Sequence, residues 1–165
     1  YCPGSINLRP FRGLKPEAFE ADLQINFISL VKVIQAVLPN LIAGEQSSIV
    51  LFSSVAASMG MPFHTSVAAA KGAIEGFAKA LAAEYAPKIR VNVIAPSLTD
   101  TPLADKFLNN ETKQEKSAER HPLKRFGKPE DSAQMASFLL SDKSSWISGQ
   151  IFHVDGGMST LLVNG

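Results

Sequence analysis

Short apolar segments placed between long helical patterns constrain the fold of this 165-residue chain more than any other feature. Residues 48–53 (SIVLFS) form a short apolar run that contains two β-branched residues. Such a run predicts a strand that is buried on both faces, which is typical of a parallel sheet. Residues 90–95 and 150–154 predict two further strands.

Helical patterns separate these strands. Apolar residues between Phe19 and Leu38 recur at three- and four-residue spacing, which predicts a helix over residues 16–39 that Pro39 and Gly44 close. A second helix is predicted over residues 65–86, and a shorter one begins near Pro129. The polar residues 97–128 predict a long loop. The alternation predicts an α/β fold with a parallel sheet and helices on both faces.

Composition and charge narrow the function classes. Hydrophobic residues make up 45% and charged residues 19% of the chain, as expected for one globular domain over residues 1–165. A net charge of +1 gives no electrostatic case for binding nucleic acid or an anionic membrane. The apolar stretch 27–42 is interrupted by polar residues and is predicted to be too short and too polar to span a bilayer.

The single cysteine, Cys2, excludes an internal disulfide, and no secretion signal is present, so a cytoplasmic location is expected. No metal site is predicted.

Several motifs follow one another along the chain. Residues 64–71 read His-Thr-Ser-Val-Ala-Ala-Ala-Lys, residues 89–96 read Ile-Arg-Val-Asn-Val-Ile-Ala-Pro, and Asp155-Gly156-Gly157 follows the last predicted strand. In this order they resemble the Tyr-x-x-x-Lys segment, the next strand and turn, and the C-terminal signature of the short-chain dehydrogenase/reductase family. The resemblance covers residues 4–157 and implies the C-terminal half of a Rossmann-like, doubly wound parallel sheet with three αβα layers.

The resemblance also implies roles for individual residues. Ser54, Lys71 and Asn26 correspond to the family's catalytic serine, lysine and asparagine. Lys71 would also hold the nicotinamide ribose, while Pro96, Thr99 and Thr101 fall in the stretch that contacts nicotinamide. The implied cofactor is NAD or NADP, and the implied substrate is a small alcohol or carbonyl compound.

The chain departs from the family at the proton-donating position. Val67 occupies the place of the catalytic tyrosine, and its spacing from Ser54 suits the family. Valine carries no ionisable group, so it cannot supply the general acid–base contribution of roughly 10²–10⁴ in rate. His64 lies three residues earlier and is a weaker candidate for a replacement acid.

No segment matches the family's phosphate-binding loop, Thr-Gly-x-x-x-Gly-x-Gly. We therefore expect weak or no cofactor binding by this chain alone. Two hypotheses follow: an NAD(P)-dependent oxidoreductase that is impaired at Val67, or a non-catalytic binding or assembly subunit. We also expect a homo-oligomer, formed through helices 16–39 and 65–86 or through the open edge of strand 48–53, unless the chain is part of a longer molecule that covers this edge. Residues 105–128 are expected to form a solvated lid over the substrate cleft.

Overall fold

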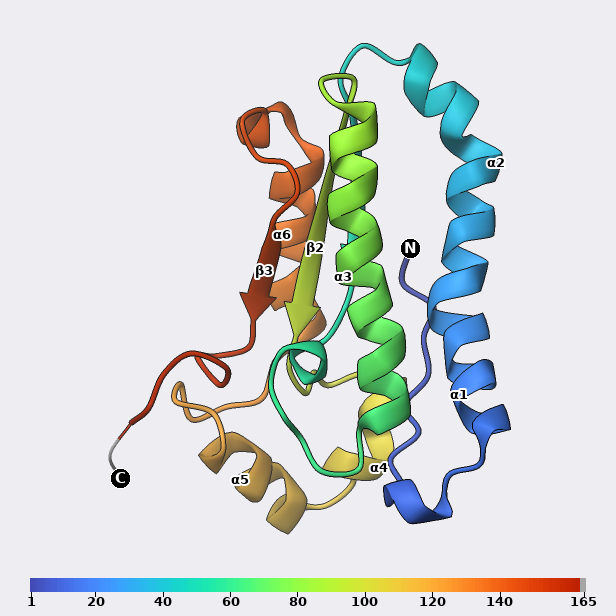
Figure 1. The fold of residues 1–165 in the computed structure, drawn as a ribbon. Helices are drawn as coiled ribbons and strands as arrows, with labels where there is room; N and C mark the ends of the chain where they lie inside the picture. The colour runs from blue at the N-terminus through green and yellow to red at the C-terminus, as the bar shows by residue number, and fades with distance from the viewer. Residues whose placement is uncertain (164–165) are drawn as a thin grey trace.

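A parallel sheet stands at the centre of the molecule in the computed structural model, which describes residues 1–163 (Figure 1). Its described strands lie in the order β1-β2-β3 and are all parallel. Their bounds are β1 Ser47–Phe52, β2 Ile89–Pro96 and β3 Ile151–Val154. The predicted α/β class and parallel sheet are confirmed, and no strand edge shifts by more than one residue.

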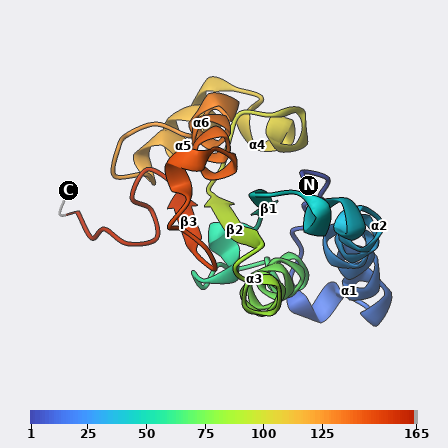
Figure 2. The ribbon, with the colours of Figure 1, turned by 90° about the horizontal axis from the view of Figure 1, so that it is seen from above.

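Helices cover both faces of this sheet. Helix α3 and the continuous helix formed by α1, a π-helical turn and α2 lie on one face, and α6 lies on the other (Figure 2). The bounds are α1 Pro16–Leu23, π-turn Gln24–Ile28, α2 Ser29–Ala43, α3 Thr65–Tyr85, α4 Asp105–Leu108, α5 Glu111–Glu119 and α6 Pro129–Leu140. The predicted helices at residues 65–86 and from Pro129 are therefore confirmed.

Two apolar cores hold the layers together. The larger core lies between β1, β2 and the helices α2 and α3, where Leu30, Ile74 and Val91 are at most 1% exposed. The smaller core packs Leu139 of α6 against Val50 and Ile94. Burial of each such side chain contributes roughly 1.5–3 kcal/mol to the free energy of folding. Segments that are apolar on both faces therefore form the strands of the sheet, where helices cover both sides.

The first helix does not end at Pro39. It continues to Ala43, with Pro39 inside it, and the Gly44 N–H donates to the Asn40 carbonyl beyond its end. Proline removes one helical hydrogen bond, so the sequence predicted a helix end at Pro39. The helix nevertheless continues, because Leu38 and Leu41 on either side of Pro39 pack against the larger core.

The π-turn interrupts this same helix. The Ser29 hydroxyl donates to the Gln24 carbonyl at 2.8 Å and so satisfies one group that the wider turn loosens. Single π-turns of this kind are frequent at functional sites.

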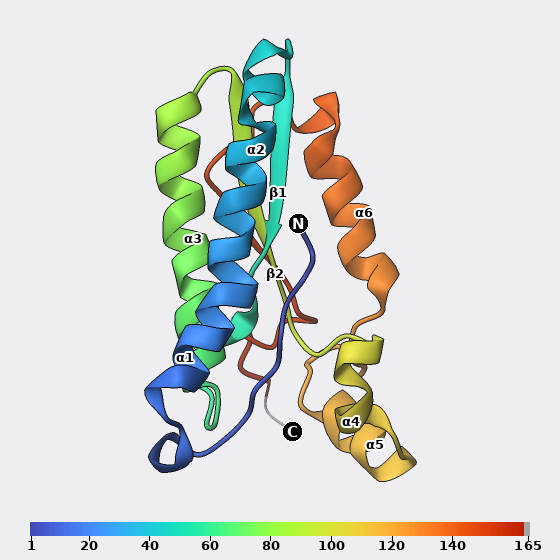
Figure 3. The same ribbon diagram turned by 90° about the vertical axis from the view of Figure 1, so that its right-hand side faces the viewer.

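Residues 97–128 contain helices rather than a continuous loop. Helices α4 and α5 occupy the lower part of the molecule in Figure 3, and the Asn110 side chain caps α5 by accepting from the Lys113 N–H at 2.9 Å. The sequence missed α5 because eight of its nine residues are polar or charged, so it shows no apolar period. We call residues 97–128 the lid.

The helix over Pro16–Ala43 is long and apolar enough, by length and composition, to cross a membrane. The stretch 27–42 is thus part of a longer helix that begins at Pro16 and ends at Ala43, so length and composition alone do not exclude a membrane span, and the expectation that this stretch does not cross a bilayer stays a prediction. The core helix of a globular protein passes the same test, but only 17% of the most apolar window here is buried. An exposed apolar face therefore remains to be explained.

The outer edge of β1 faces the N-terminal segment. The N-terminus lies beside the end of β1 in Figure 3, and the Tyr1 amino group lies 3.5 Å from the Val50 carbonyl oxygen. Within residues 1–163, β2 is the only strand that pairs with β1. Most backbone groups on this outer edge are thus without a strand partner.

Candidate functional site

A cleft of about 860 Å³ opens at the carboxyl ends of β1 and β2. Open parallel sheets bind ligands in this position because the loops that follow adjacent strands meet there. One wall consists of the end of β1, the start of α3 and the N-terminal segment, and we call it the packed wall. The lid forms the opposite wall.

Ser54 follows β1 directly and faces this cleft. It is the N-cap of a short 3-10 turn, where its hydroxyl oxygen accepts a hydrogen bond from the Ala56 N–H at 3.2 Å. The preceding Ser53 points the other way and donates to the Glu75 carboxylate at 2.7 Å. Alternation along the strand therefore sends one serine toward the helix and the next toward the cleft.

Lys71 lies on α3 and is only 9% exposed. Its ammonium group donates to the Phe52 carbonyl at 3.0 Å, which places it at the end of β1 and close to Ser54. Burial lowers the pKa of Lys71 from 10.5 to about 8, and the charge of nearby Cys2 partly opposes this shift. Lys71 therefore places an ammonium group at the cleft, and the Phe52 carbonyl is its one hydrogen-bond acceptor among the described residues.

Asn26 lies in the π-turn and is fully buried. Its amide donates to the Ser5 hydroxyl at 2.9 Å and to the Asp22 carbonyl at 2.8 Å, and its oxygen accepts from the Ser5 N–H at 3.3 Å. The structure thus places Asn26 behind the cleft wall and not on its surface.

Gly4 connects Asn26 with Lys71. A Cβ atom at Gly4 would stand 3.1 Å from the Asn26 side-chain oxygen and 3.5 Å from the Lys71 nitrogen. The missing side chain leaves a small hollow beside both polar groups. A side chain here would crowd them, which explains why glycine suits this position.

Val67 lines the same cleft, one helical turn before Lys71, and is 5% exposed. Residues four apart share one face of a helix, so Val67 and Lys71 point toward the same space. His64 also lines the cleft, but it is the N-cap of α3 and its Nδ1 lies 2.7 Å from the Pro62 carbonyl oxygen.

Pro96, Thr99 and Thr101 line the cleft where β2 runs into the lid. The Thr99 hydroxyl donates to the Ser97 carbonyl at 3.0 Å, and Thr99 pairs with Gly127 in a parallel bridge. The start and end of the lid are therefore joined at this point.

Ser97 and His121 form a pair that the sequence did not bring forward as site residues. His121 is 3% exposed, and its Nδ1 lies 2.6 Å from the Ser117 carbonyl oxygen, so Nδ1 carries the proton in the neutral ring. Its Nε2 then accepts from the Ser97 hydroxyl at 2.8 Å. No sequence pattern marks this pair, because 24 residues separate its two members.

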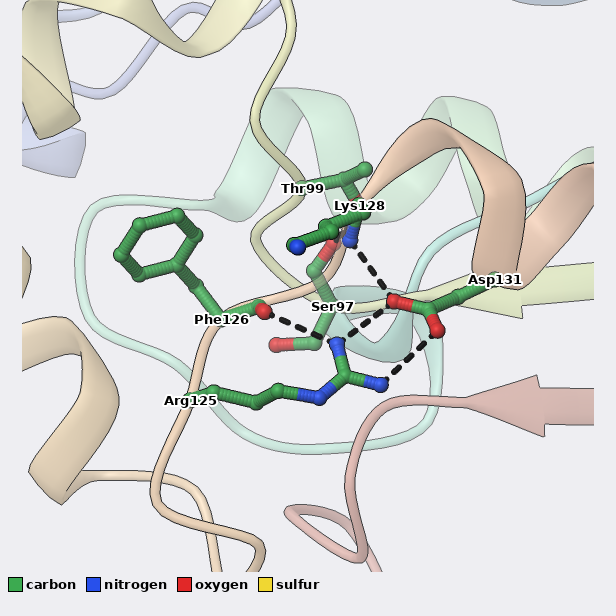
Figure 4. A network of polar contacts seen from close by, with 6 residues as sticks. All are labelled: Ser97, Thr99, Arg125, Phe126, Lys128 and Asp131. Atoms are coloured by element: carbon green, nitrogen blue, oxygen red, sulfur yellow. Dashed lines mark hydrogen bonds and ion pairs between the residues drawn. The ribbon is translucent and has the colours of Figure 1, made fainter.

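The end of the lid is fastened to α6 by a bidentate ion pair (Figure 4). The Arg125 guanidinium donates to both Asp131 carboxylate oxygens, at 2.6 and 2.8 Å. The Lys128 N–H donates to the same carboxylate at 2.7 Å. These bonds lower the pKa of Asp131 to about 2, with the Arg125 hydrogen bond as the largest cause.

These residues fit the nicotinamide end of a dinucleotide cofactor. The hollow at Gly4 borders the Lys71 ammonium group, and Thr99 and Thr101 line the same cleft. A ribose takes hydrogen bonds from an ammonium group, and a carboxamide takes them from hydroxyl and backbone groups. The chemistry present is thus suitable.

Comparison with known proteins places this arrangement in a family. Residues 3–159 match the family described as Enoyl-(Acyl carrier protein) reductase. The chain is 40% identical over 146 residues to the 3-oxoacyl-(acyl-carrier-protein) reductase of Thermotoga maritima, covering 88% of this chain and 58% of that protein. This chain belongs to the short-chain dehydrogenase/reductase family, whose members are oxidoreductases.

Two further relatives bear on the site. The chain is 36% identical over 144 residues to a Xanthobacter autotrophicus protein named inactive 2-(S)-hydroxypropyl-CoM dehydrogenase 2, covering 84% of this chain and 63% of that protein. The Burkholderia cenocepacia gluconate 5-dehydrogenase, solved with NADP and tartrate, superposes with a TM-score of 0.90 at 28% identity, covering 96% of this chain and 63% of that one. The chain thus spans about three fifths of the length of its relatives.

Proposed function

We propose that this chain is the C-terminal part of an NAD(P)-dependent oxidoreductase for an alcohol or carbonyl substrate, and that Val67 impairs its chemistry. The observation that carries the proposal is the packed wall, where Ser54, Val67 and Lys71 face one cleft. Ser54 and Lys71 supply polar groups that such a reaction needs, whereas Val67 has no ionisable group that could donate a proton.

In this proposal each residue has a distinct task. The Ser54 hydroxyl donates to the substrate oxygen, and Lys71 binds the ribose and adds positive charge beside the reacting oxygen. Pro96, Thr99 and Thr101 hold the carboxamide. Asn26 acts indirectly, because it fixes the segment at Ser5 and Gly4 against Lys71. When bound, nicotinamide supplies or accepts the hydride.

Val67 leaves the proton step without its donor, so a loss of roughly 10²–10⁴ in rate is expected. His64 is poorly placed to compensate because it lies at the N-cap rather than within the helix, with one ring nitrogen engaged by Pro62. Because the residues present reach only the nicotinamide end, we expect weak cofactor binding by this chain alone.

The experiment restores the phenol. A chain completed with the N-terminal half of the Thermotoga maritima relative is prepared as wild type, Val67→Tyr and Val67→Phe. The tyrosine variant should raise kcat/KM for carbonyl reduction by about 10²–10⁴. The phenylalanine variant controls for the ring without its hydroxyl and should remain at the wild-type level.

A second function has a specific observation behind it, since a relative named inactive shares 36% identity with this chain. Under this alternative the chain is a non-catalytic binding or assembly subunit. No reduction by Val67→Tyr across a broad carbonyl panel, with cofactor binding confirmed by fluorescence, would support the subunit and contradict the enzyme.

We also propose that a second copy of the chain covers the exposed apolar residues of α1–α2. We propose a cytoplasmic location as well, because a chain with a single cysteine suits a reducing compartment. Five apolar residues along α1–α2 are 37–46% exposed: Ile25, Ile28, Val33, Val37 and Ile42. Light scattering should show a dimer that Val33→Glu/Val37→Glu dissociates, while Lys143→Glu, with the same change in charge, does not. Persistence of the dimer in the double variant would move the interface to the open edge of β1.

A further inference from the structure

The lid helix α5 separates its charges between two faces. Lys113, Lys116 and Arg120 recur at spacings of three and four and line the cleft. Glu111, Glu115 and Glu119 recur four apart, and none of them lines the cleft. At about 100° per residue, the mean directions of these two sets lie roughly 130° apart around the helix.

The cleft as a whole carries the same sign of charge. Lys71 and Lys106 join the three cations of α5 in its lining, and within residues 1–163 no aspartate or glutamate lines it. The whole chain is almost neutral, with 16 lysines and arginines against 15 acidic residues. The positive charge is thus a property of this site and not of the protein surface in general.

Carboxylates do not neutralise these cations. The one ion pair among the described residues joins Arg125 to Asp131. The Lys113 ammonium group donates to the Lys106 carbonyl and the Asn109 amide oxygen, and Lys106 donates to the Ile6 carbonyl. These acceptors are neutral, so each lysine keeps its full charge for a ligand.

The rest of the cleft lining is largely apolar, with Val55, Val67 and Phe107 among its side chains. Apolar walls of low dielectric strengthen the field of nearby charges inside a cleft. A ligand that fits has a reactive oxygen at one end, an apolar middle and an anionic group at the other.

We propose that the substrate of this site is an alcohol or carbonyl compound whose apolar chain ends in an anionic group, held by Lys116 and Arg120 of the lid. The inference rests on the proposed function for the position of the reacting carbon. It adds the substrate class, which could not be predicted from the sequence because the sequence does not show which lid charges face the cleft.

The test measures binding by this 165-residue chain, so hydride transfer is not needed. Octanoate is compared with octanamide, which has the same length and shape but no charge. Titration calorimetry should give about tenfold tighter binding of octanoate, the effect of one charge-assisted hydrogen bond in a partly solvated site. Raising NaCl to about 0.5 M should reduce this preference by screening.

Variants locate the anion. Lys116→Gln/Arg120→Gln should abolish the preference for octanoate. Lys79→Gln/Lys88→Gln removes the same charge from exposed residues outside the cleft and should leave the preference intact. Amide shifts in α5 of the wild-type chain on adding octanoate give an answer that does not depend on the folding of any variant.

Three outcomes would overturn the inference: equal binding of octanoate and octanamide, loss of the preference in Lys71→Gln instead, or displacement of octanoate by nicotinamide mononucleotide. The last would assign the cations to a cofactor phosphate. The two proposals can fail separately. If the chain prefers octanoate but the completed Val67→Tyr variant reduces no carbonyl, the anion site stands and the proposed function is wrong.

Discussion

The two walls of the cleft are built by different means. In the packed wall and directly behind it, polar groups such as Lys71 and Asn26 are buried, hydrogen-bonded and held by the core. In the lid, the polar groups of α5 are mostly exposed and meet neutral acceptors or solvent. The packed wall thus specifies geometry, whereas the lid specifies charge.

The largest effect should come from the core behind the packed wall. Leu30→Ala should lower the free energy of unfolding by about 2–5 kcal/mol, because Leu30 is fully buried in the larger core. Leu108→Ala in the lid should cost clearly less, since Leu108 belongs to neither described core cluster. Urea denaturation measures both, and equal losses would break the distinction between the walls.

Lys71 gives a pH dependence that belongs to the packed wall. Its pKa is about 8 in the folded chain and 10.5 when solvated, so the unfolded chain binds more protons between these values. Stability should therefore rise by up to about 3 kcal/mol as pH increases from about 8 to 10.5. Urea midpoints across this range should lose the rise in Lys71→Met, and an unchanged slope in that variant would assign it to another group.

Asn26 tests the hydrogen bonds that fix the π-turn. Asn26→Ala leaves the Ser5 and Asp22 groups without their partner and should cost about 1–3 kcal/mol. Gln24→Ala, at an exposed position of the same turn, is the matched control and should change the melting temperature little. Similar losses in both variants would mean that the turn, and not the buried amide, sets the cost.

The smallest effect is expected at the fastening of the lid. Asp131→Asn breaks the bidentate pair with Arg125 and should cost at most about 1 kcal/mol, since both groups are partly exposed. The lowered pKa of Asp131 gives stability that is present above its ordinary value of 3.8 and is lost as pH falls through about 2. Calorimetric melting at pH 5 and pH 2 should therefore differ less in the variant than in the wild type.

The same contrast explains what could be predicted from the sequence. Residues 48–53, 65–86 and 90–95 lie in the core, and their apolar patterns predicted the strands and the helix that carry Ser54 and Lys71. The lid helix α5 consists almost entirely of polar residues, so no apolar pattern predicted it. Pro39 predicted an early helix end because proline weakens a helix locally, whereas Leu38 and Leu41 stabilise it through packing.

Site residues divided in a similar way. The family resemblance implied site roles for Ser54, Lys71, Pro96, Thr99 and Thr101, and all five line the cleft. Two sets of residues were missed. The pair of Ser97 and His121 depends on a contact across 24 residues, and the cations of α5 acquire a common direction only once the helix forms.

The π-turn has a consequence for the editing of this chain by insertion or deletion. The residues buried along its helix, Asp22, Asn26, Leu30 and Ile34, are spaced by four. In a regular helix each step of four advances by about 40°, so the line would wind away from its neighbour by about 120° in all. The wider turn absorbs part of that winding. Loss of one residue between positions 24 and 28 would therefore convert the wider turn into a regular one and keep Asp22 in phase with Leu30 and Ile34, whereas loss of one residue within α2 would rotate everything downstream by about 100°.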